Sequence, residues 1–149
     1  MVRRDVPIAG QAFDMERARL SQQDTDYQFT AAVVGRYLHV TGAGRHTADN
    51  MRRFLADAYR AATDRGCDSV LLVLRFSGPS LDLGSIYSVV TERSMDGSRL
   101  KRIAFVDTNA EHPPERAEFA EMAANKLGVN VRLFRGVAEA ERWLFDDST

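Results

Sequence analysis

The sequence predicts an α/β fold in which helices pack on a single mixed, mostly parallel sheet. Two observations predict it. Two strand-like segments joined at a glycine come first, and apolar runs typical of buried strands then alternate with amphipathic segments typical of helices. Such alternation predicts parallel strands connected by helices, in the order β-β-α-β-α-β-α-β-α. The length of 149 residues fits one domain.

The first half of the chain predicts an N-terminal arm, a hairpin and a helix. Residues 1–25 lack a sustained apolar period, so we expect either a mobile arm or a short helix, followed by the domain over residues 26–147. The segments "YQFTAAVV" and "YLHVTG" flank Gly35, which suits the tight turn of an antiparallel hairpin. Thr47 is the expected N-cap of the next helix, and Gly66 its terminator.

The second half predicts central strands and their helices. The runs "SVLLVLRF" and "KRIAFVD" are the most continuously aliphatic, which is typical of strands covered on both faces. The helix of "PPERAEFAEMAANKLG" begins at its prolines and ends at Gly128. "VNVRLFR" alternates like an outer strand, and "VAEAERWLF" carries the apolar stripe of a last helix.

The composition excludes several classes of protein. A net charge of -1 argues against a nucleic-acid partner, which usually requires a basic surface. No apolar run approaches the ~20 residues that span a bilayer, and no apolar region follows the N-terminal arginines as it would in a secretory signal. The lone Cys67 fits a reducing compartment. We therefore expect a soluble, cytoplasmic protein with no membrane span.

A loop rich in serine and glycine, "RFSGPSLDLGS", follows the first central strand. Open α/β sheets place binding sites at the carboxyl ends of such strands, and the next helix begins with N–H groups that attract anions. The predicted partner- or ligand-binding residues lie in this loop and at the end of the next central strand: Arg75, Ser77, Ser80, Asp82, Ser85 and Asp107.

A simpler interpretation of the same residues is favoured by the sequence. Ser80 or Asp82 would cap the following helix, and Asp107 would form a turn. The loop lacks the spacing and the lysine of a phosphate-binding loop. We expect no metal, no cofactor and no catalytic residues, because the histidines and Cys67 show no metal-ligand spacing and no G-x-S-x-G motif is present.

Residues 26–145 resemble the SpoIIAA-like branch of the STAS group, both in the order of the expected elements and in their amino-acid sequence. The members of this group are related to bacterial anti-sigma-factor antagonists. The segments that carry the resemblance are "VLLVLRFSGPS", "DLGSIY", "RIAFVD" and "FAEMAANKLGVNVRLFRGVAEAERWL". The resemblance implies a non-enzymatic regulatory domain that docks onto a protein partner. In the antagonists, a serine in an Asp-Ser-Ser-Gly motif is phosphorylated. Here Asp82 matches the aspartate, but Leu83 stands where the acceptor serine should be, so we expect no such switch.

Two alternatives stay open. The SpoIIAA-like branch is also similar to the lipid-carrying Sec14/CRAL-TRIO domains, which implies a pocket for a small apolar or anionic molecule beneath helix 81–95. The residues expected to line that pocket, or else simply to fill the core, are Leu81, Leu83, Ile86 and Val90. A hydrolytic enzyme is the least favoured alternative. The identity of a partner and the formation of a homodimer are left open.

Overall fold

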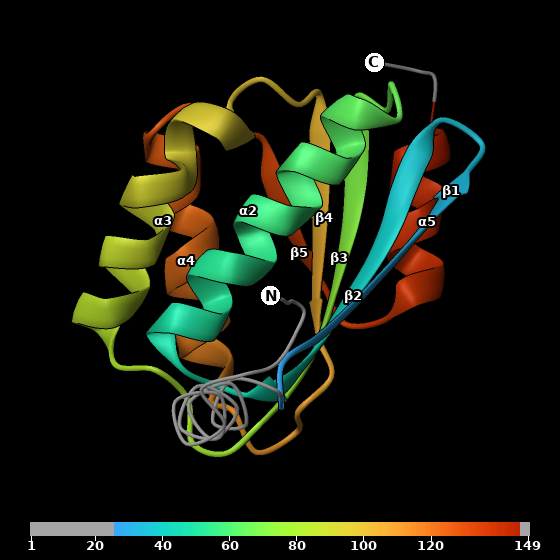
Figure 1. The fold of residues 1–149 in the computed structure, drawn as a ribbon. Coiled ribbons are helices and arrows are strands. Elements are labelled where there is room, and N and C mark those ends of the chain that lie inside the picture. Colours follow the sequence, from blue (N-terminus) through green and yellow to red (C-terminus); the bar gives the residue numbers. More distant parts are fainter. Residues whose placement is uncertain (1–25, 147–149) are drawn as a thin grey trace, which may run out of the picture.

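A five-stranded sheet forms the centre of the protein, seen in a computed structural model that describes residues 26–146. β1 and β2 are antiparallel, and all later neighbours are parallel (Figure 1). The order across the sheet, β1-β2-β3-β4-β5, is also the order along the chain. The mixed, mostly parallel sheet is therefore confirmed, with β1 (Gln28–Val34), β2 (Tyr37–Arg45), β3 (Ser69–Ser77), β4 (Arg102–Asp107) and β5 (Val131–Phe134).

The helices cover the two faces of the sheet unequally. Parallel strands are joined by right-handed crossovers, so a sheet that grows in one direction places every crossover helix on the same face. α2 (Ala48–Asp64), α3 (Leu83–Gly97) and α4 (Pro114–Lys126) are those helices, and α5 (Val137–Phe145) covers the other face (Figure 1). α3 packs against α2 and α4 rather than directly on the sheet.

Local signals in the sequence explain where the first elements begin and end. Gly35 has a φ of 60° in the hairpin turn, a conformation that glycine adopts without strain. The Thr47 side chain accepts a hydrogen bond from the Asn50 N–H at 3.0 Å and caps α2, as predicted. Gly66, with a φ of 70°, follows the end of this helix. The expected arm over residues 1–25 lies outside the described residues.

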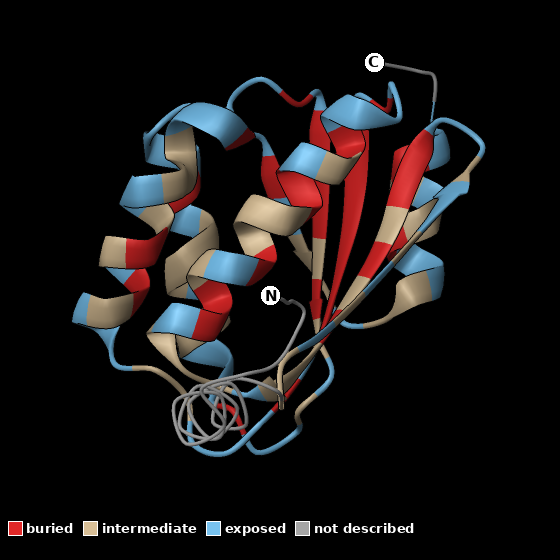
Figure 2. Ribbon diagram, in the orientation of Figure 1, coloured by how far each residue is buried: buried red, intermediate tan, exposed pale blue. Residues whose placement is uncertain are grey.

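The core has two parts, one on each face of the sheet. The larger lies under α2, α3 and α4 and includes Leu38, Phe54 and Leu72. The smaller lies between the sheet and α5 and includes Leu71 and Val106. β3 is buried from Ser69 to Leu74, which confirms that this strand is covered on both faces (Figure 2).

Candidate functional site

Three loops meet at the carboxyl ends of β2, β3 and β4, the edge where parallel sheets usually place their sites. The N–H of His46, just before α2, donates to the Ser77 carbonyl at 2.8 Å. The Asn109 side chain, after β4, donates to the Phe76 carbonyl at 3.0 Å. The loops after β2 and β4 are thus both fastened to the end of β3.

His112 lies at the centre of this network and is 9% exposed. Its Nδ1 is 2.8 Å from a carboxylate oxygen of Asp107, and its Nε2 is 2.9 Å from the Gly78 carbonyl and 3.2 Å from the Asn109 amide nitrogen. An ionised carboxylate only accepts hydrogen bonds, so Nδ1 carries the proton that is donated to Asp107. The ring therefore holds the end of β4 through Asp107, and its Nε2 faces the loop between β3 and α3.

His46 stacks on His112, with ring centroids 4.5 Å apart and planes inclined by 27°. Burial lowers the pKa of His46 below its usual value of 6.5, and the neighbouring His112 lowers it further. A hydrogen bond to the Pro79 backbone and the charge of Asp107 act in the opposite direction. The Nδ1 of His46 is buried and has no hydrogen-bond partner among the described residues. This arrangement favours the neutral imidazole.

An apolar cavity of about 100 Å³ lies between α3 and the sheet. It exists because α3 rests on α2 and α4 and leaves space above the strands. Ile86 and Val90 of α3 form one wall, and Leu74 and Phe105 belong to the strands beneath. For scale, an apolar cavity of ~150 Å³ holds a benzene molecule.

The cavity has polar groups at two ends. At the carboxyl edge of the sheet are His46, Asp107 and Arg116, and the Arg116 guanidinium donates to the Leu81 carbonyl. Towards the other edge are Tyr59 in the second half of α2 and Arg93 in the second half of α3. The cavity is thus apolar along its length and polar at its ends.

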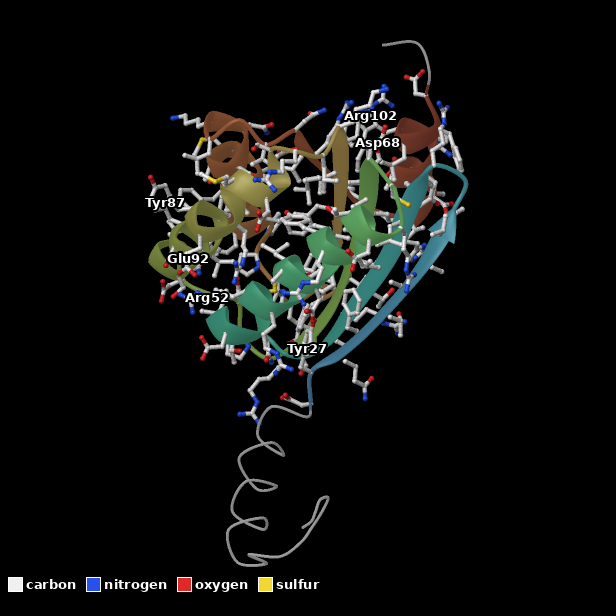
Figure 3. All side chains as sticks on the ribbon, turned by 45° about the horizontal axis from the view of Figure 1, so that its top comes forward. Tyr27, Arg52, Asp68, Tyr87, Glu92 and Arg102 are labelled. Atoms are coloured by element: carbon white, nitrogen blue, oxygen red, sulfur yellow. The ribbon has the colours of Figure 1, made fainter. Side chains whose placement is uncertain are left out.

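Arg52 connects α2 to α3 on the outside of this cavity. Its Nε lies 3.0 Å from a Glu92 carboxylate oxygen, and its Nη2 lies 3.4 Å from the Ser88 hydroxyl, both on α3 (Figure 3). The same guanidinium also pairs with Asp49, one turn earlier on α2, at 2.9 Å. Because these groups are partly exposed, the connection contributes only modestly to stability.

The predicted loop residues form mainly local hydrogen bonds. The Asp82 carboxylate accepts from the Ser85 N–H at 2.7 Å, which confirms the interpretation that it caps α3. This hydrogen bond is the largest reason why the pKa of Asp82 lies below its usual value. The Ser77 hydroxyl donates to the Gly44 carbonyl, and that of Ser80 to the Leu81 carbonyl.

The other predicted residues are separated. Strand alternation places Arg75, which is exposed, on the same side of β3 as Leu71 and Val73, away from the cavity. Asp107 lines the cavity and holds His112. Of Arg75 and Asp107, only Asp107 therefore lies at the cavity.

The expected pocket beneath α3 has partly different walls. Ile86 and Val90 line the cavity as predicted. The prediction is wrong for Leu83, which is 47% exposed in the first turn of α3. Leu81 is half-buried and packs against the larger core.

Sequence reasoning missed four side chains that line the cavity or hold its edge together. His46 and His112 each follow a strand, and that shared placement was the only signal that they would meet. Arg116 lies in the first turn of α4, and Arg93 lies mid-helix, where an arginine usually points into solvent. Nothing in the local sequence distinguishes either of them.

Comparisons of this chain with protein-family models, with curated proteins and with solved structures found no match. Within residues 26–146, no three side chains of the metal-binding types are arranged to hold an ion. In the same part of the chain, none of the helices combines the length and apolar character needed to cross a membrane. The geometry of the cavity is therefore the basis for any functional conclusion.

Proposed function

We propose that this protein is a non-catalytic binding protein that takes a small, largely apolar molecule into the cavity beneath α3. The observation that carries the proposal is the cavity itself, which is lined by residues of three helices and of the central strands. Apolar side chains form nearly all of its wall, and polar groups lie only at its ends. Small-molecule sites commonly combine an apolar wall with few polar groups.

The stability lost to an empty cavity supports a binding role. Protein interiors are normally packed as tightly as organic crystals. At the ~24 cal/mol per Å³ found for closed cavities left by truncated side chains, about 100 Å³ corresponds to at most roughly 2 kcal/mol of the free energy of unfolding, and to less where the space opens to solvent. That is a substantial part of the ~5–15 kcal/mol that stabilises a typical domain. A bound molecule would restore the missing contacts.

The polar groups near the cavity favour binding over catalysis. The Asp107 carboxylate accepts from His112 and from the Asn109 N–H, so its oxygens are already engaged. Among the described residues, no serine or cysteine side chain forms a hydrogen bond with His46 or His112, as an activated nucleophile would. These groups have the geometry of a structural network.

The proposal is tested with the full chain and two matched variants. Native mass spectrometry of the purified protein should reveal a small molecule that co-purifies, and NMR titration with isobutane or xenon should shift methyl signals of Ile86 and Val90. Ala120→Leu fills the cavity from α4 and should abolish both effects. Ala138→Leu adds the same side chain on the exposed surface of α5 and should change neither. Bare protein mass together with no response to either probe would overturn the proposal.

A second candidate function is docking onto a protein partner through the loop 76–88, as the SpoIIAA-like resemblance implies. One observation favours it: Leu83 and Tyr87, four residues apart on α3, are 47% and 52% exposed. Residues at this spacing share one face of a helix, so the two side chains present a small apolar surface beside Asp82. The order of elements is compatible with the resemblance, which remains a proposal.

Affinity capture from the native cell extract tests this second function. The double variant Leu83→Ser with Tyr87→Ser should lose a partner that the wild-type chain captures. Val33→Ser, which removes an exposed valine from β1, should retain it. Equal capture by all three proteins would show that this surface does not bind the partner.

A further inference from the structure

We infer that the molecule bound beneath α3 is a small monocarboxylate whose carboxylate is held by Arg93. This inference rests on the proposed binding function and adds the chemical class of the ligand. It is carried by the position of Arg93, by a buried nitrogen that lacks a partner, and by the different charges at the two ends of the cavity.

Arg93 stands where the apolar cavity meets a hollow on the surface. This hollow, of about 280 Å³, lies along the second halves of α2 and α3. Tyr59 and Arg93 line both the cavity and the hollow. A molecule with its hydrocarbon part in the cavity would therefore present its other end to these two side chains and to water.

The Arg93 side chain has a hydrogen-bond donor without an acceptor. Its Nε is buried and has no hydrogen-bond partner among the described residues. A buried donor without an acceptor destabilises a protein, and an acceptor from a ligand would remove that penalty. A carboxylate suits a guanidinium particularly well, because its two oxygens can accept two parallel N–H bonds.

The charges around the two ends favour the anion at Arg93. The charged residues that line the surface hollow are Arg60, Arg93, Arg99, Asp64 and Asp96. Three arginines and two aspartates give it a net charge of +1. The nearby carboxyl ends of α2 and α3 carry partial negative charge, so the guanidinium groups must supply the attraction. At the opposite end, the Asp107 carboxylate would repel an anion, and Arg116 is already bonded to the Leu81 carbonyl.

The size of the cavity limits the hydrocarbon part. By comparison with the ~150 Å³ that accommodates benzene, about 100 Å³ has room for roughly four carbons. Isovalerate, a branched four-carbon skeleton bearing a carboxylate, is a suitable probe. Isopentanol has the same skeleton and lacks the charge.

The test compares these two probes by NMR titration of the full chain. We expect the wild-type protein to bind isovalerate about tenfold or more tightly than isopentanol, as a charged hydrogen bond would give. Arg93→Met should remove this preference and retain binding of the alcohol. Arg75→Met removes an exposed arginine from the other face of the sheet and should leave the preference unchanged.

Each other outcome is informative. Equal affinity of the wild-type chain for both probes would overturn the inference that the ligand carries a carboxylate. It would not contradict the proposed apolar binding site. Binding of neither probe would overturn this inference, and with no co-purifying molecule it would overturn the proposed function too. If Arg93→Met fails to fold, Arg93→Lys should keep the sign of the preference and reduce it, because an ammonium group lacks the planar pair of N–H donors that matches both carboxylate oxygens. An undiminished preference in that variant, or a loss of preference in Arg75→Met, would contradict the role of Arg93.

Discussion

The two faces of the sheet show that the number of helices on a face does not determine how well it is packed. One helix, α5, lies directly on β3, β4 and β5, and Leu71 and Ala104 beneath it are fully buried. Three helices cover the opposite face and still leave a cavity of about 100 Å³. The middle helix there is supported by its neighbours, so it spans the gap above the strands.

Side-chain size explains much of this difference. α5 points Leu144, Val137 and Trp143 towards the smaller core. The α4 residues around the cavity are mainly small: Ala117, Ala120 and Ala124. α3 adds few large side chains, because Leu83, Tyr87 and Met95 are exposed. The cavity is therefore encoded by alanines where the other face has larger residues.

The largest expected effect on stability is beneath α5. Leu71→Ala should lower the free energy of unfolding by about 3 kcal/mol, since a fully buried leucine leaves a new cavity when it is truncated. Ile86→Ala should lower it by less, about 2 kcal/mol, because this side chain already borders empty space. Urea denaturation measures both values. Equal losses would mean that the two faces are equally well packed.

Filling the cavity should have the opposite sign. Ala120→Leu should raise the free energy of unfolding by about 1 kcal/mol, because the added methyl groups gain contacts where none existed. Its surface counterpart, Ala138→Leu, should stay within about 0.5 kcal/mol of the wild type. A loss of stability in Ala120→Leu would show that the cavity is too narrow or wrongly placed to accept the side chain.

The pH dependence of stability should report on the loop network that borders the cavity. The folded state lowers the pKa of His46, so below pH 6.5 the unfolded chain takes up a proton that the folded chain resists. The contribution of His46 is therefore complete above pH 6.5, and is lost as the pH falls through that value towards the lowered pKa. Asp107 and His112 are the titratable neighbours that act on it.

Urea denaturation between pH 8 and pH 5 measures this effect on the full chain. His46→Gln removes the titrating group and should flatten the decline. An identical decline in the wild type and in His46→Gln would assign the pH dependence to other groups.

The smallest effect is expected from the connection between α2 and α3. Arg52→Ala should lower the free energy of unfolding by only about 0.5 kcal/mol, because its ion pairs are partly exposed. Hydrogen exchange should nevertheless speed up in α3, which packs mainly against α2 and α4, and stay unchanged in α5. A similar change in both helices would indicate a global rather than a local effect.

The fold class could be predicted from the sequence because the signals that define the helices and strands are local. The hairpin glycine, the Thr47 cap and the aliphatic runs each act within a few residues, and the alternation of elements then restricts the topology. The same locality explains why the capping role of Asp82 was predictable. The order of the strands across the sheet, and with it the face that each helix covers, was not part of the prediction.

The candidate site depends on contacts between distant segments, which explains why much of it was not predictable. His46 and His112 are far apart in the chain and meet only when three loops converge. Helical periodicity suggested an apolar face for α3, but it could not show that the first turn, with Leu83, is exposed. Nor could it show that Arg93 reaches between a cavity and a surface hollow.

The order of the strands also bears on how the chain folds. Every parallel strand is added beside the one that precedes it in sequence, so no segment has to wait for a distant strand to be inserted. Loops that close over one helix involve smaller sequence separations than crossovers that skip strands, and folding rates rise as such separations fall. During synthesis, the hairpin and α2 can form first and present β2 as a template for β3. The sheet can thus be assembled in the direction in which the chain is made.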